Sequence, residues 1–441
     1  MNKIKRRLRY SYTAAFAGFI FGFDTIVISG VDQKLQDLWH STDLFHGLVV
    51  VGMALWGTVI GAIFGGLPTN YFGRKKTLLW IGYLYSISAI GSSISTDPIT
   101  FAFFRFIGGV GIGISTIAAP AYISEISAPN ERGNLVGYYQ LNIVVGILFA
   151  FVSNFFLKEF GESSWRIMVG IEAIPAILYT VMIMYISQSP RWIYLNGNIS
   201  KSKHIYEKLF SSSEKEIFLK EISETKNEFQ KDDSIFKIKY RFILYLAFMI
   251  AFFNQFSGIN AFLYYSPRIF QEGGLGENSA FLSSIGIGVI NLIFTIIGIS
   301  LIDKLGRKVL MIIGSIGYII SLTFIFLSFL LSWRGIILPL ALFLFIAAHA
   351  VGQGSVIWVY ISEIFPNHIR SSGQSFGTST HWLLAALIPS MIPFLFSNIG
   401  ASYVFLIFLL MMIFQLIFVV FSMPETKGKS LETLSNELIK R

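Results

Sequence analysis

The sequence has no cysteine and few charged residues, and both absences narrow what the chain can be. Without cysteine, disulfides and thiolate metal sites are excluded. Charged residues make up 13% of the 441 residues, against about 25% in soluble domains. Hydrophobic residues make up 54%, and apolar runs repeatedly reach the roughly 20 residues that cross a bilayer. These features predict a helical integral membrane protein.

We expect twelve transmembrane helices, because twelve apolar runs are separated by polar segments. They cover residues 10–30, 44–68, 77–95, 99–121, 134–157, 165–187, 242–271, 279–302, 309–331, 336–360, 372–396 and 402–422. Most of the 34 Lys and Arg residues fall on the side that holds both termini, and the positive-inside rule assigns that side to the cytoplasm. The net charge of +9 therefore reflects topology and does not indicate a nucleic-acid partner.

The two halves of the chain repeat each other. The sequence YISEI occurs at 122–126 and again at 360–364, and Gly-Arg-Lys occurs at 73–75 and 306–308. Two parallel six-helix repeats with a site between them are a transporter architecture. We therefore predict a first bundle at 1–187, a linker with short cytoplasmic helices at 188–240, a second bundle at 241–423 and a cytoplasmic tail at 424–441.

The repeated acids and arginines predict ion pairs at the cytoplasmic helix ends. The candidate gate residues are Arg74, Glu125 and Arg132 in the first half and Arg307, Glu363 and Arg370 in the second. We expect each Glu to pair with an Arg of its own half and so to hold the inner face closed until the protein opens inward. The alternative is that these charges only anchor the helix ends, which explains the arginines but not the recurring Glu.

Two charged residues lie inside apolar spans. Asp24 is the only acid of the first span, and a carboxylate at the bilayer centre costs roughly 2.5–3.5 kcal/mol. Arg105 lies among phenylalanines in the fourth span. We expect the two to pair, so that protonation of Asp24 couples a proton to a conformational change. The alternatives are a hydrated Asp24 near the interface and an Arg105 that extends to the outer interface.

Neutral amides and aromatic rings gather mainly in the second half. Gly and Pro at 258–267 interrupt the seventh span, and interrupted spans line cavities. The polar and aromatic candidates are Gln140, Asn254, Gln255, Asn260, Tyr265, Asn291, Trp358, His381 and Trp382. Amides that both donate and accept hydrogen bonds, beside aromatic faces, are suited to a neutral polyhydroxylated ligand. Each amide alone could instead join two helices, and only the set favours a binding site.

Motifs in order along nearly the whole chain resemble the sugar porter family of the major facilitator superfamily. They are GFDT at 22–25, VISG at 27–30, GRKK at 73–76, RFIGG at 105–109, SPRW at 189–192, NQFSGIN at 254–260, DKLGRK at 303–308, SEIFP at 362–366 and PETKG at 424–428. The resemblance implies the major facilitator fold, an all-α membrane protein of twelve transmembrane helices in two six-helix pseudo-repeats. It also implies a monosaccharide carrier that works by alternating access.

The same resemblance implies roles for particular residues. The positions that match sugar contacts of the family are Gln140, Gln255, Asn260, Asn291, Trp358 and Trp382. Asp24 and Arg105 match the pair that proton-coupled members use. The departures from the usual pattern are Asn70, Ile147, Gln188, Asn254, Ser355 and His381. Ile147 is aliphatic where some pentose carriers place a polar group, which favours a hexose such as glucose.

The sequence therefore predicts a proton-coupled monosaccharide symporter that uses protons as its coupling ion and no metal or other cofactor. The alternatives are an uncoupled uniporter, a carrier of a pentose or of a polyol such as inositol, and a transporter-like sugar sensor. Motifs of an enzyme, such as a nucleophile elbow or a phosphate loop, do not occur, so we expect no catalytic residues. We expect a multi-pass protein of a bacterial plasma membrane that contacts lipid, works as a monomer and keeps both termini in the cytoplasm.

Overall fold

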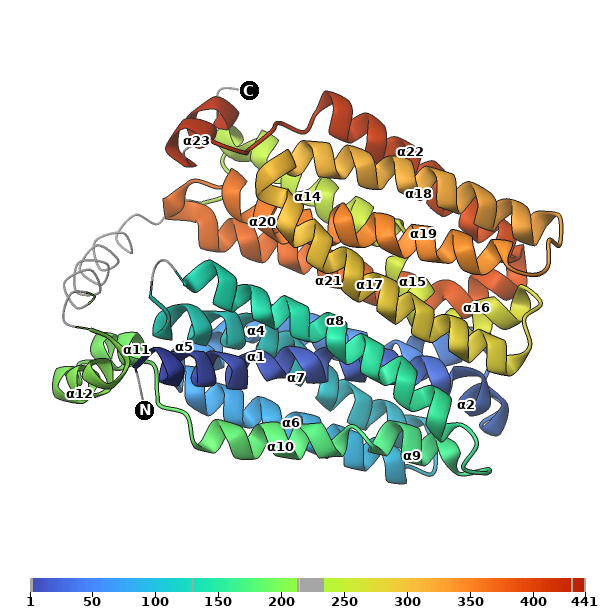
Figure 1. Ribbon diagram of the computed structural model, residues 1–441, viewed down its shortest axis with the longest axis horizontal. Helices are drawn as coiled ribbons and strands as arrows, with labels where there is room; N and C mark the ends of the chain where they lie inside the picture. The colour runs from blue at the N-terminus through green and yellow to red at the C-terminus, as the bar shows by residue number, and fades with distance from the viewer. Residues whose placement is uncertain (1–2, 129–130, 212–213, 215–233, 430, 440–441) are drawn as a thin grey trace. The chain divides into compact units, whose positions relative to one another are not determined.

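The computed structural model describes residues 3–128, 131–211, 214, 234–429 and 431–439, and the regular elements in these residues are all helices (Figure 1). Two short helices, α11 (Pro190–Leu195) and α12 (Ile199–Leu209), lie where the sequence predicts short linker helices. The remainder of that prediction, at 215–233, lies outside the described residues. The domain boundaries predicted from the sequence repeat stay predictions.

The first of two packing units comprises Met1–Thr25, Met53–Ala150 and Glu162–Lys231. Most of its residues belong to long helices that pack side by side. The helices are α1 (Lys3–Val27), α4 (Met53–Phe64), α5 (Gly66–Tyr71), α6 (Arg74–Ile94), α7 (Pro98–Ile126), α8 (Arg132–Leu157), α9 (Ser164–Gly170) and α10 (Ala173–Met184).

Glycines let helices of this unit approach to backbone contact. A Cβ atom on Gly109 of α7 would lie 1.9 Å from the carbonyl oxygen of Ala54 in α4. A Cβ atom on Gly146 of α8 would lie 2.0 Å from the carbonyl oxygen of Phe19 in α1. Lipid is as apolar as the side chains, so membrane helices associate largely through such close packing of small residues.

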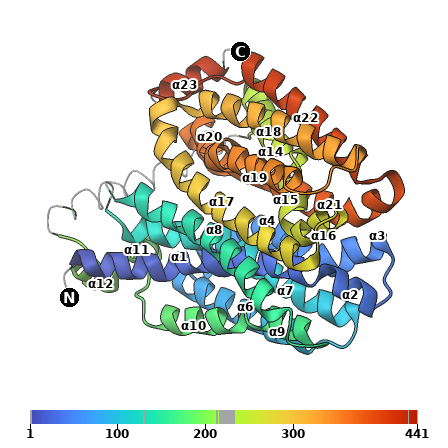
Figure 2. The ribbon, with the colours of Figure 1, turned by 45° about the vertical axis from the view of Figure 1, so that its right-hand side comes forward.

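The second unit comprises Ile26–Gly52, Phe151–Gly161 and Asp232–Arg441. In it α18 packs against both α19 and α22 (Figure 2). Its helices are α2 (Asp32–Leu38), α3 (Asp43–Phe45), α14 (Arg241–Phe256), α15 (Ile259–Tyr264), α16 (Ser266–Glu272), α17 (Glu277–Leu305), α18 (Arg307–Leu330), α19 (Ile337–Val351), α20 (Gln353–Ile364), α21 (Arg370–Ile399), α22 (Ala401–Phe421) and α23 (Leu431–Ile439), with the π-helix η2 (His46–Val51).

The described helices account for the twelve predicted spans. Eleven are long and apolar enough to cross a membrane. The pair Asp43–Val51 and Met53–Phe64, which bends by 43°, brings the number to twelve when it is counted as one span. The second span is therefore bent at Gly52, where the sequence predicts a continuous helix over 44–68.

The seventh span is interrupted as predicted. Helix α14 ends at Phe256, α15 begins at Ile259, and Gly258 between them has a φ of +85°, a conformation that favours glycine. The ring of Phe408 lies 2.5 Å from the position that a Cβ atom on Gly258 would occupy, so a side chain there would also clash. The interruption sets Asn254 and Gln255 on one side of a turn and Asn260 on the other.

The sixth and tenth spans are interrupted as well, which the sequence analysis did not predict. In the sixth span Pro175 has no N–H for the carbonyl group of Ile171, and α9 and α10 are separate helices there. In the tenth span Gly352 separates α19 from α20, and the Ser355 hydroxyl donates to the freed carbonyl oxygen of Ala350 at 2.6 Å.

Candidate functional site

The intramembrane charges of the first unit form a buried ion pair. Arg105 Nη1 donates to Asp24 Oδ1, and Arg105 Nη2 donates to the Asp24 carbonyl oxygen at 2.9 Å. The Asp24 side chain is 0% exposed and that of Arg105 is 1% exposed. The expected pairing is therefore present, and both the hydrated Asp24 and the interfacial Arg105 are wrong. Burial of such a pair is tolerable only because direct hydrogen bonds join its members.

A third buried charge, Glu172, lies beside this pair and was missed in the sequence. It lies in the break between α9 and α10, is 1% exposed, and interacts electrostatically with Asp24 and Arg105. Neither its carboxylate oxygens nor Asp24 Oδ2 has a hydrogen-bond partner among the described residues. Glu172 is an acid within an apolar run, the same signal that identified Asp24. The site therefore holds two carboxyl groups and one guanidinium.

The gate candidates of the first unit meet at helix ends. Arg74, at the start of α6, approaches Glu125 near the end of α7 with its Nη2 2.8 Å from Oε1. The same arginine donates to Asn70 Oδ1 at 3.2 Å, so the amide at this unusual position also helps to hold the arginine. Arg132 begins α8.

The second unit repeats this arrangement and adds to it. Arg307, at the start of α18, lies 2.7 Å from Glu363 Oε1 through its Nη2. Thr426 donates to the other Glu363 oxygen at 2.6 Å. Arg370 begins α21 and donates through Nε to the Phe365 carbonyl oxygen at 3.3 Å.

Most of the candidate substrate residues come together at the interrupted seventh span. Asn260 Nδ2 donates to Gln255 Oε1, and Gln255 Nε2 donates to Asn254 Oδ1, both at 2.8 Å. The His381 ring nitrogens lie 3.2 and 3.3 Å from Gln255 Nε2. The His381 ring in turn contacts Trp358 edge-on, with centroids 4.8 Å apart. The result is a polar cluster flanked by aromatic rings.

The remaining candidates of the second unit have different partners. Trp382 contacts His381, with ring centroids 5.1 Å apart. Tyr265, between α15 and α16, is fully buried, and its hydroxyl donates to the Pro389 carbonyl oxygen of α21 at 3.0 Å. Asn291 in α17 is 7% exposed and accepts from Thr295 at 3.4 Å.

Gln140 and Ile147 belong to α8 in the first unit, whereas the other substrate candidates belong to the second unit. Gln140 is half-buried. Ile147 is 7% exposed, and its backbone nitrogen lies 3.0 Å from the position of a Cβ atom on Gly22 in α1.

Another buried cluster of charges, in the second unit, was not predicted. His46 Nε2 lies 2.7 Å from Asp32 Oδ1, and both side chains are essentially unexposed. Arg268 Nη1 lies 3.5 Å from Asp32 Oδ2 and donates to Gln36 at 2.9 Å, while its Nε bonds Glu272 at 3.1 Å. We call Asp32, His46 and Arg268 the outer cluster. No motif or repeat marks these residues, so nothing in the sequence pattern connects them.

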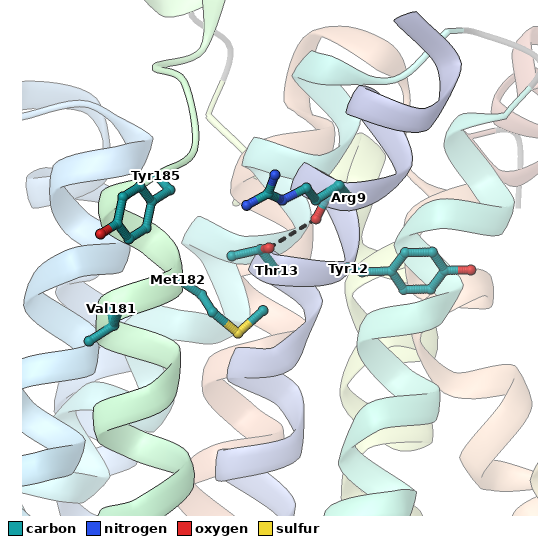
Figure 3. Close-up of a pocket in the computed structure, with 6 residues that line it drawn as sticks. All are labelled: Arg9, Tyr12, Thr13, Val181, Met182 and Tyr185. Atoms are coloured by element: carbon teal, nitrogen blue, oxygen red, sulfur yellow. Dashed lines mark hydrogen bonds between the residues drawn. The ribbon is translucent and has the colours of Figure 1, made fainter. Parts of the chain in front are cut away.

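A cavity of about 440 Å³ lies elsewhere, between α1 and α10 of the first unit (Figure 3). Its lining residues are Arg9, Tyr12, Thr13, Val181, Met182 and Tyr185. Thr13 donates to the Arg9 carbonyl oxygen at 2.9 Å, and the Tyr185 side chain is 71% exposed. The lining residues include none of the candidate site residues.

Comparison with known proteins agrees with the geometry. Residues 10–438 match the family model described as "Sugar (and other) transporter". The arabinose–proton symporter of Bacillus subtilis is 35% identical over 98% of this chain and 94% of its own length. The glucose transporter GlcP of Staphylococcus epidermidis is 33% identical over 97% of this chain and 96% of its own length.

Solved structures agree as well. The xylose transporter XylE of Escherichia coli, in its inward open conformation, has a TM-score of 0.85 and 30% identity, and the match covers 97% of this chain and 99% of XylE. The apolar helices, the repeated helix ends and these matches lead to one conclusion. The chain belongs to the sugar porter family of the major facilitator superfamily and is a multi-pass membrane transporter, not an enzyme.

Proposed function

We propose that the protein is a proton–monosaccharide symporter of a bacterial plasma membrane that works by alternating access. The observation that carries this proposal is the buried group of Asp24, Glu172 and Arg105. With both carboxyl groups ionised the group carries a net charge of −1, and with one proton bound it is neutral. An uncompensated charge inside a membrane is costly, and binding a proton removes it.

Asp24 is the group that exchanges the proton in this proposal. Its bonds to Arg105 join α1 to α7, and a neutral carboxyl group holds a guanidinium less strongly than a carboxylate does. Glu172 supplies a second negative charge for Arg105 once Asp24 is neutral. Protonation then loosens the contact between α1 and α7 without leaving Arg105 uncompensated.

The amide cluster at Asn254, Gln255 and Asn260 is the proposed sugar site, with Trp358, His381 and Trp382 as its aromatic side. A neutral sugar needs groups that both donate and accept hydrogen bonds, which amides supply. Gln140, Asn291 and Tyr265 complete the proposed set, and Ile147 supports a hexose such as glucose. The relatives do not decide the sugar, because one is named for arabinose and another for glucose.

The proposal extends to the rest of the transport cycle. The Arg74–Glu125 and Arg307–Glu363 pairs act as cytoplasmic gates, with Arg132 and Arg370 beside them. Protons are the coupling ion, no further cofactor takes part, and a monomer in lipid with both termini in the cytoplasm is the working unit.

Uptake into proteoliposomes tests the function directly. Purified protein is given labelled D-glucose, D-xylose, L-arabinose and myo-inositol, with and without an inward proton gradient. We expect one monosaccharide, and first D-glucose, to accumulate against its gradient only when protons flow inward. Downhill sugar movement without proton uptake would make the protein a uniporter, accumulation of inositol or a pentose would change the substrate, and binding without transport would indicate a sensor.

A further inference from the structure

A hydrogen-bond chain runs from the amide cluster into the interior of the second unit. It crosses four helices, α14, α20, α22 and α18, and begins at α15. The links, each donor first, are Asn260 Nδ2 to Gln255 Oε1 at 2.8 Å, Gln255 Nε2 to Asn254 Oδ1 at 2.8 Å, Asn254 Nδ2 to Gln353 Oε1 at 3.4 Å, Gln353 Nε2 to Gln415 Oε1 at 2.7 Å, Gln415 Nε2 to Ser315 Oγ at 2.8 Å, and Ser315 Oγ to the Met311 carbonyl oxygen at 2.7 Å.

The far members of this chain are sealed from the site. Gln353, Gln415 and Ser315 are each 0% exposed, whereas Asn260 at the other end is only half-buried. Leaving a buried amide without a partner costs about 1–3 kcal/mol, so each link holds its neighbour in one orientation. Gln353 and Gln415 therefore hold the amide cluster in one orientation from its buried side.

The direction of the chain is fixed at its buried end. The Ser315 hydroxyl has one proton, which it donates to the Met311 carbonyl oxygen, so its oxygen can only accept. Gln415 must then turn its NH₂ group to Ser315 and its oxygen to Gln353. Each amide between Gln415 and Asn260 likewise directs its NH₂ group towards the Ser315 end of the chain and its oxygen towards the Asn260 end.

The direction of the chain determines which group Asn260 presents at the end near the sugar site. Asn260 uses its NH₂ group to bond Gln255. Its carbonyl oxygen is thereby directed away from the chain, as an acceptor. A ligand hydroxyl that meets this oxygen has to donate a proton to it.

We infer that Gln353 and Gln415 are positioning residues that fix Asn260 as a hydrogen-bond acceptor, so that the transporter requires a donating hydroxyl at one ring position of its sugar. This inference rests on the proposed sugar site. Neither glutamine touches the sugar, and their effect is on which substituents the site accepts.

Deoxy and fluoro derivatives of the sugar test whether the site requires a donating hydroxyl. Fluorine can accept weakly but cannot donate, so at the ring position that meets Asn260 a monofluoro sugar should bind as poorly as the monodeoxy sugar. We expect both to bind the parent protein roughly tenfold more weakly than the unmodified sugar, as loss of one buried hydrogen bond implies. The probes are D-glucose and D-xylose with their monodeoxy and monofluoro derivatives, measured by calorimetry in detergent.

Substitutions at the buried end of the chain test whether that end fixes the orientation of Asn260. Gln353→Met and Ser315→Ala free the amides to reverse, so the fluoro sugar should approach the unmodified sugar to within about threefold. Ser315→Ala removes only a hydroxyl, so it tests the inference even if Gln353→Met fails to fold. Ser328→Ala, which removes a buried hydroxyl of α18 that bonds its own helix, is the matched control and should keep the parent ratio.

Two different failures are separable. If Asn260→Ala and Gln255→Ala bind every probe as the parent does, the proposed sugar site is wrong. If those variants lose affinity but Ser315→Ala and Gln353→Met keep the parent's discrimination against fluorine, the site stands and the positioning role is overturned.

Discussion

At the scale of the residue, the chemistry depends on which charges share a buried volume. Asp24 and Arg105 could be predicted because each is a lone charge in an apolar run. Glu172 carries the same signal in the sixth span, and applying the rule to every span would have found it. Asp32, His46 and Arg268 could not be predicted, because they lie near polar helix ends and only folding brings them together.

The substitution Asp24→Asn tests the proton site. Asn resembles the protonated acid permanently, so we expect accumulation driven by a pH gradient to be abolished while sugar binding in detergent stays within about threefold of the parent. Asp97→Asn is the matched control. Asp97 is a partly exposed acid whose side chain caps α7, and Asn keeps that capping ability. Retained uphill accumulation in Asp24→Asn would rule out Asp24 as the coupling group.

Removal of the guanidinium tests how the three charges balance. Arg105→Met leaves Asp24 and Glu172 without a cation, and we expect it to lower the free energy of unfolding by about 3–5 kcal/mol. Adding Asp24→Asn to that variant should restore part of the loss, because one uncompensated carboxylate disappears. Thermal unfolding in detergent measures both. Equal stability of the single and double variants would show that the charges do not act together.

At the scale of the element, close packing between helices and the contacts at helix ends stabilise the structure. The seventh span could be recognised as interrupted from its Gly and Pro residues. The break at Gly352 could not, since a glycine inside an apolar run fits a continuous membrane helix equally well. The bend at Gly52 could not be predicted from the sequence for the same reason. What decides between a continuous and an interrupted helix at these glycines is the packing around them, which the local sequence does not record.

The contact between α4 and α7 leaves no room for a methyl group. We expect Gly109→Ala to destabilise the protein by about 1–3 kcal/mol, because the new Cβ atom would meet the Ala54 carbonyl oxygen at 1.9 Å. Gly137→Ala in α8 is the control, since a Cβ atom there meets nothing within 4 Å and alanine favours a helix. Thermal unfolding of the two variants should separate them, and equal unfolding temperatures would contradict the tight contact.

Glu425 caps the start of α18 and should make stability depend on pH. Its carboxylate accepts from the backbone N–H groups of Arg307 and Lys308, both at 3.0 Å. Burial acts to raise the pKa of Glu425, but hydrogen bonds from four backbone N–H groups outweigh burial and lower the pKa below its usual value. The stabilisation is therefore complete above the usual pKa of about 4.3 and is lost as the pH falls through the lowered value.

Thermal unfolding between pH 7 and pH 3 measures this contribution. Glu425→Gln should unfold at a lower temperature than the parent at pH 7, and the difference should shrink as the pH approaches the lowered pKa. Glu437→Gln, at an exposed acid of α23, is the control and should follow the parent. A difference that does not change with pH would assign the effect to packing and not to charge.

At the scale of the whole molecule, the repeat in the sequence predicts the fold and the pairs at the helix ends. The Arg74–Glu125 and Arg307–Glu363 pairs follow from two copies of one motif, so the sequence alone identified their members. It could not choose between the two arginines of each half. That choice depends on where α6 and α18 begin relative to the preceding turn, which is a matter of backbone geometry.

The absence of cysteine makes the gates measurable. A single reporter, Thr380→Cys, next to His381, is labelled in inside-out vesicles by a membrane-impermeant thiol reagent. Glu125→Gln or Glu363→Gln should speed that labelling severalfold, because each removes one ion pair that we propose to close the inner face. Glu159→Gln, at an exposed acid, is the control. Labelling at the parent's rate or more slowly would refute the gates.

The outer cluster has a consequence for cutting the chain into separate fragments. Residues 26–52 and 151–161 come from the first half of the chain but pack with the second unit, where His46 and Asp32 meet Arg268 and where Gly47 lies against the Ser390 carbonyl group. The half of the chain that repeats in sequence is thus not the unit that packs in space. A chain cut between the repeats would give a second fragment that lacks residues 26–52 and 151–161 of its packing unit, and a first fragment that carries these residues without the helices they pack against. We expect function to return only when both fragments are made together.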